Sequence, residues 1–407
     1  MNEAGGSGAS RPRGQVAEVF AAFLVLGSTA FGGPIAHPGY MREEFVQRRG
    51  WLDEVRFAQL LAICQFLPGP ASSQLGFAIG LLRAGWGGAL AAFVGFTLPS
   101  ALLMAGFAVL APRLGTGVGA DVLHGLKLVA VVVVGHGLVG MARQLVPDLP
   151  RALIAVTVCA LAVLTGTAWM QLLAIASGGL AGALLCRRVR MPEPAAFPVR
   201  YGRGVACACL AVFGLGLGAA VMSPDAAAPT PAGVAAAFYR AGALVFGGGH
   251  VVLPLLEQGV VAPGWVGADA FIAGYGAAQA VPGPMFSLAA FLGAKVPLDL
   301  PAGAGAVIAL VTVFLPGFLL VLAVLPAWAF LARHRLATGV IAGVNAAVVG
   351  LLAAAFHDPV WTEGIRAPMD MVIAAIGFAL LAVARVAPLW AVLWCVAASV
   401  AMGMWWA

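Results

Sequence analysis

Residues 51–70 read WLDEVRFAQLLAICQFLPGP, and residues 265–284 read WVGADAFIAGYGAAQAVPGP. Both stretches run from a Trp to a Pro-Gly-Pro at the same spacing, with a Phe six residues after the Trp and a Gln three residues before the first Pro. Because four matched features in register are improbable by chance, the chain contains an internal duplication. Paired apolar segments that Pro and Gly interrupt in corresponding halves of a chain are typical of the binding site of a membrane carrier.

The composition is that of a membrane protein. Of the 407 residues, 62% are hydrophobic and 9% are charged, whereas soluble domains carry about 25% charged residues. The apolar runs are long and continuous, so they predict helices and not the alternating strands of a barrel. We therefore expect an all-α polytopic protein with the lipid bilayer as its surroundings. The net charge of +6 is weak evidence for nucleic-acid binding, and no nucleic-acid partner is predicted.

The N-terminal tail and the cysteines bring no further function. Residues 1–15 are polar and rich in Gly and Ser, and without the apolar core of a signal peptide they are expected to form a disordered cytoplasmic tail. The six cysteines include no Cys-x-x-Cys pair and no Cys/His cluster. We therefore predict no metal, no cofactor and no disulfide framework.

About 13 apolar segments divide into two repeats of opposite orientation. The first repeat is expected at 16–186 and the second at 232–407, separated by a linker at 187–203 and a connecting span at 204–222. The linker carries five Arg, which places it and the N-terminus in the cytoplasm under the positive-inside rule. An odd number of membrane crossings separates equivalent positions of the two repeats, so the second repeat is inverted relative to the first.

The loop charges add a second expectation. Residues 42–56 carry four Arg, and the equivalent residues 256–270 carry no Lys or Arg. These four Arg stay cytoplasmic only if the segments around them are re-entrant hairpins. Non-helical backbone at membrane depth must be buried in protein or line a wet cavity, so such hairpins should meet centrally. The expected hairpins are 16–38, 54–82, 232–254 and 269–295, with tips at Gly32-Gly33-Pro34 and Gly247-Gly248-Gly249.

The residues after each Pro-Gly-Pro suit an anion. Proline is favoured in the first turn of a helix, so Pro70 and Pro284 should begin new helices. A helix N-terminus offers free N–H groups and about half a positive charge, which binds anions without a buried cation. The alternatives are a structural kink and serines that bond their own backbone. The candidates are Pro68, Gly69, Pro70, Ser72, Ser73, Gln65, Pro282, Gly283, Pro284, Ser287, Gln279, Gly32, Gly33, Gly247 and Gly248.

Lys127 is a charge inside an apolar segment, 122–142. Charges at such positions usually face the protein interior and mark a pathway, so Lys127 is a candidate to attract the anion. The alternative is that its ammonium group reaches the nearby membrane surface. Its repeat partner is the neutral Asn345, also a candidate for the site, so any role of the charge is asymmetric.

Four further titratable residues are candidates for a gate or a proton carrier. Glu43 and Glu257 align under the spacing of the two copies, although a solvated helix face explains Glu43 equally well. His136 lies deep in an apolar segment, where a packed neutral imidazole is the simpler interpretation. His250 follows the glycine triplet of the second copy and has no histidine partner in register.

At these positions the chain resembles the chromate ion transporter family, in its long, two-domain bacterial form. The resemblance extends from about residue 16 to the C-terminus. It implies a multi-pass protein of the bacterial inner membrane that exports chromate and so confers chromate resistance. The matching elements are Phe31-Gly32-Gly33-Pro34 with Phe246-Gly247-Gly248-Gly249-His250, the two Trp-to-Pro-Gly-Pro blocks, and Gly125-Leu126-Lys127 with Gly343-Val344-Asn345.

Other functions stay open at this point. A carrier for another oxyanion such as sulfate would share the same site, and an anion channel would also use helix N-termini. An embedded enzyme would need a nucleophile with a base, or metal ligands, in the apolar core. The sequence shows no such group, so the protein is not expected to be an enzyme. A homodimer is compatible with such a fold, and no interface for it is visible.

Overall fold

The computed structural model describes residues 15–165, 168–186, 197, 201–223, 228–246, 249–328 and 335–406. These residues form helices and connecting turns, with no strand among them. Six helical segments are long and apolar enough to cross a membrane. The all-α polytopic class is therefore confirmed. Most of the N-terminal tail, most of the Arg-rich linker, and Gly247 and Gly248 lie outside the described residues.

The two repeats have the same order of helices. The first contains α1 (Val16–Thr29), α2 (Gly33–Arg42), η1 (Glu43–Arg48), α3 (Glu54–Phe66), α4 (Ala71–Leu110), η2 (Ala111–Leu114), α5 (Val118–Leu145), α6 (Leu149–Thr165) and α7 (Ala168–Leu185). Helix α8 (Arg203–Met222) follows it.

The second repeat contains α9 (Pro231–Leu244), η3 (Gly249–Val251), α10 (Val252–Leu256), η4 (Glu257–Val261), α11 (Ala268–Ala280), η5 (Met285–Ser287), α12 (Leu288–Lys295), α13 (Ala302–Val324), η6 (Leu325–Ala327), α15 (Arg335–Ala355), η7 (Phe356–Trp361), α16 (Thr362–Gly364), α17 (Pro368–Ala382) and α18 (Pro388–Trp406).

Helix α4 folds back on itself. Ala84 and Gly85 leave the helical conformation, and Gly85 has a φ of +66°. Beyond this turn Gly88 lies against Gly80, so closely that a Cβ on either would touch the other's backbone. The second repeat makes the same turn between α12 and α13, where Gly293 lies against Gly305. Each Pro-Gly-Pro is thus followed by a short limb that returns toward the side from which the preceding helix came.

The charged contacts bring the ends of the first helices to one face of the molecule, as the predicted re-entrant hairpins require. Arg83, at the end of the returning limb of α4, pairs with Glu18 at the start of α1 at 3.2 Å. Its guanidinium lies 5.1 Å from the ring centre of Trp51, just before α3, and that of Arg49 lies 5.5 Å from the same ring. The start of α1, the end of η1, the start of α3 and the turn of α4 therefore share one face of the molecule. We call it the Arg83 face.

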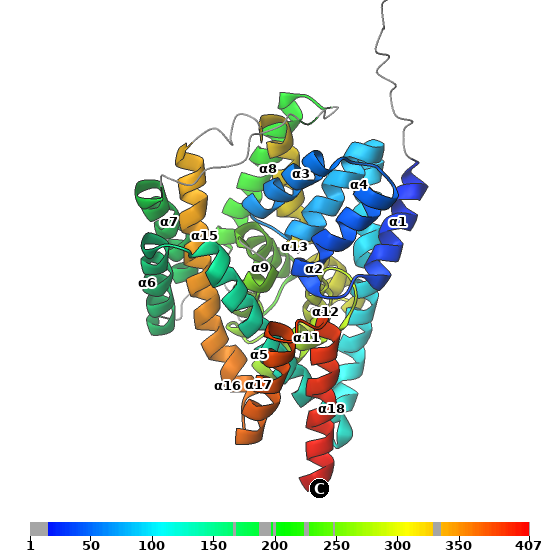
Figure 1. The fold of residues 1–407 in the computed structure, drawn as a ribbon, viewed down its shortest axis with the longest axis vertical. Helices are drawn as coiled ribbons and strands as arrows, with labels where there is room; N and C mark the ends of the chain where they lie inside the picture. The colour runs from blue at the N-terminus through cyan, green and yellow to red at the C-terminus, as the bar shows by residue number, and fades with distance from the viewer. Residues whose placement is uncertain are drawn as a thin grey trace, which may run out of the picture.

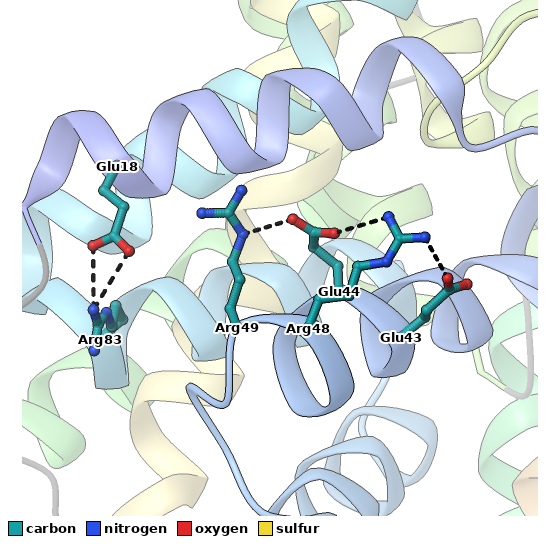
Figure 2. Close-up of polar contacts among 6 residues, drawn as sticks. All are labelled: Glu18, Glu43, Glu44, Arg48, Arg49 and Arg83. Carbon is teal, nitrogen blue, oxygen red and sulfur yellow. Dashed lines mark hydrogen bonds and ion pairs between the residues drawn. The ribbon is translucent and has the colours of Figure 1, made fainter.

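A row of ion pairs continues along this face. Arg49 pairs with Glu44 at 2.6 Å, and Arg48 lies between Glu44 at 3.7 Å and Glu43 at 2.6 Å (Figure 2). Nearby, hydrogen bonds from the Arg42 guanidinium lower the pKa of the exposed Glu54 carboxyl. The acidic and basic side chains of 42–56 thus pair with each other at the surface, where each ion pair contributes at most about 1 kcal/mol to stability. This agrees with the solvated-face interpretation of Glu43.

The two repeats exchange their last helices. α17 and α18, from the second repeat, pack on α5 of the first, while α6 and α7 of the first pack on α15 of the second (Figure 1). Small residues make the close approaches: Gly182 in α7 faces Gly343 in α15, with no room for a Cβ, as is common where membrane helices associate. α8 packs mainly on α9 and α13, and many of its side chains are exposed, as those of a lipid-facing span would be.

Candidate anion site at the paired Pro-Gly-Pro breaks

Both Pro-Gly-Pro breaks have the same backbone course. Helices α3 and α11 end at extended residues, Leu67 (φ −80°, ψ 148°) and Val281 (φ −93°, ψ 148°). The central glycines follow with φ of +124° at Gly69 and +94° at Gly283, a conformation that residues with a Cβ rarely adopt. Helical turns then begin at Ala71 and Met285, as the prolines predict.

Each break is anchored on the opposite repeat by a crossed pair of backbone hydrogen bonds. The Gly69 N–H donates to the Val245 carbonyl at 2.7 Å, and the Gly283 N–H donates to the Ala30 carbonyl at 3.0 Å. Val245 and Ala30 occupy the same position, directly after the first helix of their repeat. The N–H groups of Gly69 and Gly283 thus already donate to backbone carbonyls. Any hydrogen-bond donor offered to an anion at the breaks must come from the residues that follow.

Close packing on the opposite repeat explains the glycines further. A Cβ on Gly69 would lie 2.9 Å from the Cα of Gly317, and a Cβ on Gly283 would lie 3.0 Å from the Ser100 Oγ. Gln74 completes the first contact, because its Nε2 donates to the Pro68 carbonyl at 2.9 Å and to the Gly317 carbonyl at 3.0 Å. The sequence analysis did not single out Gln74, and only its place one turn after the break could have indicated it.

Aromatic rings link the helical turns that follow the two breaks. Phe77 in α4 stacks on Phe318 with ring centres 4.4 Å apart, Phe318 lies 6.0 Å from Phe314, and Phe314 lies 5.8 Å from Phe286. The Phe side chains come from both repeats. An apolar cluster that the sequence did not predict therefore links the helices that follow the two breaks.

Two buried hydroxyls occupy equivalent places after the breaks. Ser73 and Ser287 both stand 22 residues after their Trp and are 3% and 0% exposed. Neither Oγ has a hydrogen-bond partner in the described part of the chain. A buried polar group without a partner costs about 1–3 kcal/mol, and both repeats carry this cost at the equivalent serine.

Ser72 is engaged, unlike Ser73. Its Oγ lies 3.4 Å from the His37 Nδ1, and the His37 Nε2 lies 3.3 Å from the Ala30 carbonyl. That carbonyl also accepts the hydrogen bond from Gly283. His37, which was not among the predicted site residues, therefore connects the residues after the first break with the anchor of the second.

The other backbone and amide candidates are not equivalent in the two copies. Gln279 is buried, and its Nε2 lies 3.0 Å from the Met285 Sδ. Its Oε1 lies 3.7 Å from the Cβ position of Gly33, so one hairpin tip reaches the second break. Gln65 is exposed, and Gly32, with a φ of +100°, packs near Pro388 of α18.

Lys127 is paired and does not reach solvent as a lone charge. Its side chain is 4% exposed, and its Nζ lies 2.6 Å from a carboxylate oxygen of Asp269 in the first turn of α11. The other oxygen of Asp269 contacts Arg366, which precedes α17. The sequence analysis named neither partner. Neither residue carries a signal of its own in the sequence, since Asp269 lies in the first turn of an apolar helix and Arg366 in a short connection, both far from Lys127 along the chain.

Comparison with known proteins agrees with the duplicated architecture. The model of the chromate transporter family matches this chain twice, at residues 17–183 and 232–403. The chain belongs to the chromate transporter family. The two matched regions contain the two sets of helices described above, so the resemblance inferred from the repeated motifs is confirmed. No solved structure is significantly similar to this family member.

Curated relatives of this transporter cover most of its length. A chromate transport protein of Pseudomonas aeruginosa is 31% identical over 89% of this chain and 86% of its own. A chromate transport protein of Cupriavidus metallidurans is 30% identical over 86% of this chain and 84% of its own. A probable chromate transport protein of Synechococcus elongatus is 28% identical over 82% of this chain and 81% of its own.

The remaining candidates of the transporter lie apart from the breaks. The His250 Nδ1 is 2.7 Å from the hydroxyl of Tyr275, in a buried pair against Gly137 of α5. His136 is half-buried and presents its ring to Phe378. Glu257 begins the π-helical turn η4, just as Glu43 begins η1, and is half-buried. The Asn345 Oδ1 is buried and has no partner among the described residues.

Proposed function

We propose that this protein exports chromate from the cytoplasm across the bacterial inner membrane and thereby confers chromate resistance. Relatives named as chromate transport proteins over most of the chain support the substrate. The apolar helices support a membrane setting. The positive-inside rule supports a cytoplasmic Arg83 face, because that face carries the Arg residues of 42–56. The N-terminus, which precedes α1 at the same face, is then cytoplasmic as well.

The anion is held, in this proposal, at the helix starts that follow the two Pro-Gly-Pro breaks. The observation that carries it is the pair of buried, unpartnered hydroxyls of Ser73 and Ser287. Chromate presents four acceptor oxygens and no donor, so it suits hydroxyl and N–H donors. The breaks themselves, from Pro68 to Pro70 and from Pro282 to Pro284, hold these donors in place. Lys127 supplies a formal positive charge at the opposite end of α11, the helix that leads to the second break.

The crossed anchors suggest how the site could be exposed alternately. Inverted repeats permit two conformations in which the halves exchange roles around a fixed site. Each break is bonded to the other repeat through one carbonyl, at Val245 or Ala30. In the described part of the chain only the Ala30 carbonyl also contacts a side chain, that of His37. The two anchors are therefore unequal, as the two halves must be in any one state of an alternating carrier.

We expect the double variant Ser73→Ala and Ser287→Ala to lose transport without losing stability. Removing two hydroxyls that have no partner relieves a desolvation penalty, so the thermal midpoint in detergent should stay unchanged or rise. Chromate uptake by inside-out vesicles should fall at least tenfold, since two donors to the anion are lost. The measurement is tracer chromate uptake, normalised to folded protein in the membrane.

The matched control is Ser177→Ala in α7, whose hydroxyl is bonded to the Ala174 carbonyl of its own helix. This variant should transport like the wild type. Normal chromate uptake by the double serine variant would show that the hydroxyls do not bind the anion. A fall in uptake equal to that of the control would lead to the same conclusion.

Export of a dianion needs no coupling ion. Moving one charge across the membrane is worth about 2.3 kcal/mol per 100 mV, and a dianion that leaves a negative interior gains roughly twice that. Each 1.4 kcal/mol is a factor of ten in a concentration ratio. A membrane potential of about 100 mV alone therefore supports an outward chromate gradient somewhat above a thousandfold. We expect efflux to stop when the potential is collapsed and the pH gradient is kept. Efflux that continues under these conditions would require proton coupling instead.

A carrier for another tetrahedral oxyanion is the second candidate, because hydroxyl and N–H donors recognise the shape and charge that chromate shares with sulfate. Competition distinguishes the two. Excess sulfate that abolishes chromate uptake would indicate a general oxyanion carrier, whereas uptake that resists sulfate would support selectivity for chromate. Saturation of the uptake with substrate would also separate a carrier from an anion channel.

A further inference from the structure

The strongest charged cluster outside the breaks joins α5, α11 and the connection before α17. One carboxylate, that of Asp269, bridges the ammonium of Lys127 at 2.6 Å and the guanidinium of Arg366. The Lys127 side chain is 4% exposed and the Asp269 side chain is 60% exposed. A buried cation is therefore neutralised by an acid that stands at the edge of the protein.

The position of Asp269 connects this cluster with the second break. Asp269 lies in the first turn of α11, the helix that ends two residues before Pro282. Along the same helix, Gly276 packs directly on the backbone of Leu126, the neighbour of Lys127. The bridge to Lys127 thus fixes the outer end of the half-helix that carries the break, and releasing it would free that end from α5.

The charges around the bridge are not evenly shared. Arg366 has a second acid, since its guanidinium also lies 3.3 Å from a carboxylate oxygen of Glu363. Lys127 has Asp269 as its one carboxylate partner in the described part of the chain. The two cations are arranged around two oxygens of a single carboxylate, which is the arrangement that a tetrahedral oxyanion also offers them.

We propose that Lys127 and Arg366 form an oxyanion-binding station at this end of the pathway, and that Asp269 is an internal competitor that occupies it when no substrate is present. The inference rests on the proposed function. A dianion neutralises both cations, whereas the Asp269 carboxylate carries one negative charge. A dianion therefore competes with Asp269 better than a monoanion does. Displaced Asp269 moves into water, to which it is already exposed.

The test is equilibrium binding of tracer chromate and of tracer sulfate to the purified full-length protein in detergent. Asp269→Asn removes the competing charge and keeps an oxygen that accepts from Lys127. We expect it to tighten the binding of both dianions about tenfold, and to change inhibition by the monoanion nitrate much less. Adding Lys127→Met to this variant should abolish the gain. The matched control is Asp148→Asn, which breaks an ion pair of the same 2.6 Å with Arg151 at the start of α6.

Unchanged or weaker dianion binding in folded Asp269→Asn would overturn the inference, as would an equal gain in the Asp148 control. If Asp269→Asn does not fold, Arg366→Gln gives the reverse test at a half-exposed residue. Dianion binding should then weaken about tenfold, and unchanged binding would overturn the inference. A wild type that binds neither chromate nor sulfate would overturn the proposed function itself, an outcome distinct from wild-type binding that the variants leave unaltered.

Discussion

Replacing Gly283 by Leu is expected to abolish chromate transport. Gly283 has a φ of +94°, which costs a residue with a Cβ about 1–2 kcal/mol. The new Cβ would lie 3.0 Å from the Gly27 carbonyl oxygen and from the Ser100 Oγ, so the break or these neighbours must shift, and the rest of the leucine side chain needs more room still. Overpacking adds about 1–3 kcal/mol. We expect the free energy of unfolding to fall by about 2–5 kcal/mol and tracer uptake to fall to background.

Gly264→Leu is the matched control. Gly264 lies in the same repeat, has a φ of +79°, and nothing lies within 4 Å of its Cβ position. It introduces the same backbone strain without the collision. The control should lose about 1–2 kcal/mol of stability and keep its transport. If both variants lose transport equally per folded molecule, the fit of the break against the first repeat is not required for function.

Removing Asp269 should destabilise the protein more than removing Lys127. Asp269→Ala leaves the buried Lys127 ammonium without its carboxylate. Because the Asp269 side chain is 60% exposed, the cost should lie below the about 3–5 kcal/mol of a fully buried pair. Lys127→Met leaves Asp269 exposed and still in contact with Arg366, so stability should change little. Thermal unfolding of the two variants in the same detergent measures the difference.

Transport measurements distinguish a role of Lys127 in binding the anion from a purely structural role. Because the lysine supplies the buried charge in our proposal, Lys127→Met should lower chromate uptake at least tenfold although the protein is stable. The double variant Asp269→Ala with Lys127→Met should recover most of the stability that Asp269→Ala loses, and not the transport. Normal uptake by Lys127→Met would remove this residue from the pathway and leave it a structural role.

The sequence predicts the architecture well because the relevant signals are local and repeated. The two Trp-to-Pro-Gly-Pro blocks indicate the duplication, and the Arg residues of 42–56 indicate that α1 to α3 return to one face. The contacts of Arg83 with Glu18 and Trp51 agree with that expectation. Prolines 70 and 284 correctly mark new helical turns, since the preference of proline for a first turn depends only on neighbouring residues.

The sequence could not predict contacts that depend on how the repeats interlock. The anchors of Gly69 on Val245 and of Gly283 on Ala30 join residues far apart in the chain, as does the pair of Lys127 with Asp269. Gln65 and Gln279 match in the sequence, but one is exposed and the other buried, because the two halves adopt different surroundings in one conformation. A repeat in sequence thus indicates equivalent positions and not equal environments.

Tracer chromate uptake by proteoliposomes of the purified protein, under an imposed potassium diffusion potential that is positive inside, tests the central claim most directly. The wild type should accumulate chromate in proportion to the potential, and the Ser73→Ala/Ser287→Ala variant, equally folded, should not. No chromate uptake by the wild type, or equal uptake by both proteins, would contradict an oxyanion carrier that holds its substrate at the paired Pro-Gly-Pro breaks.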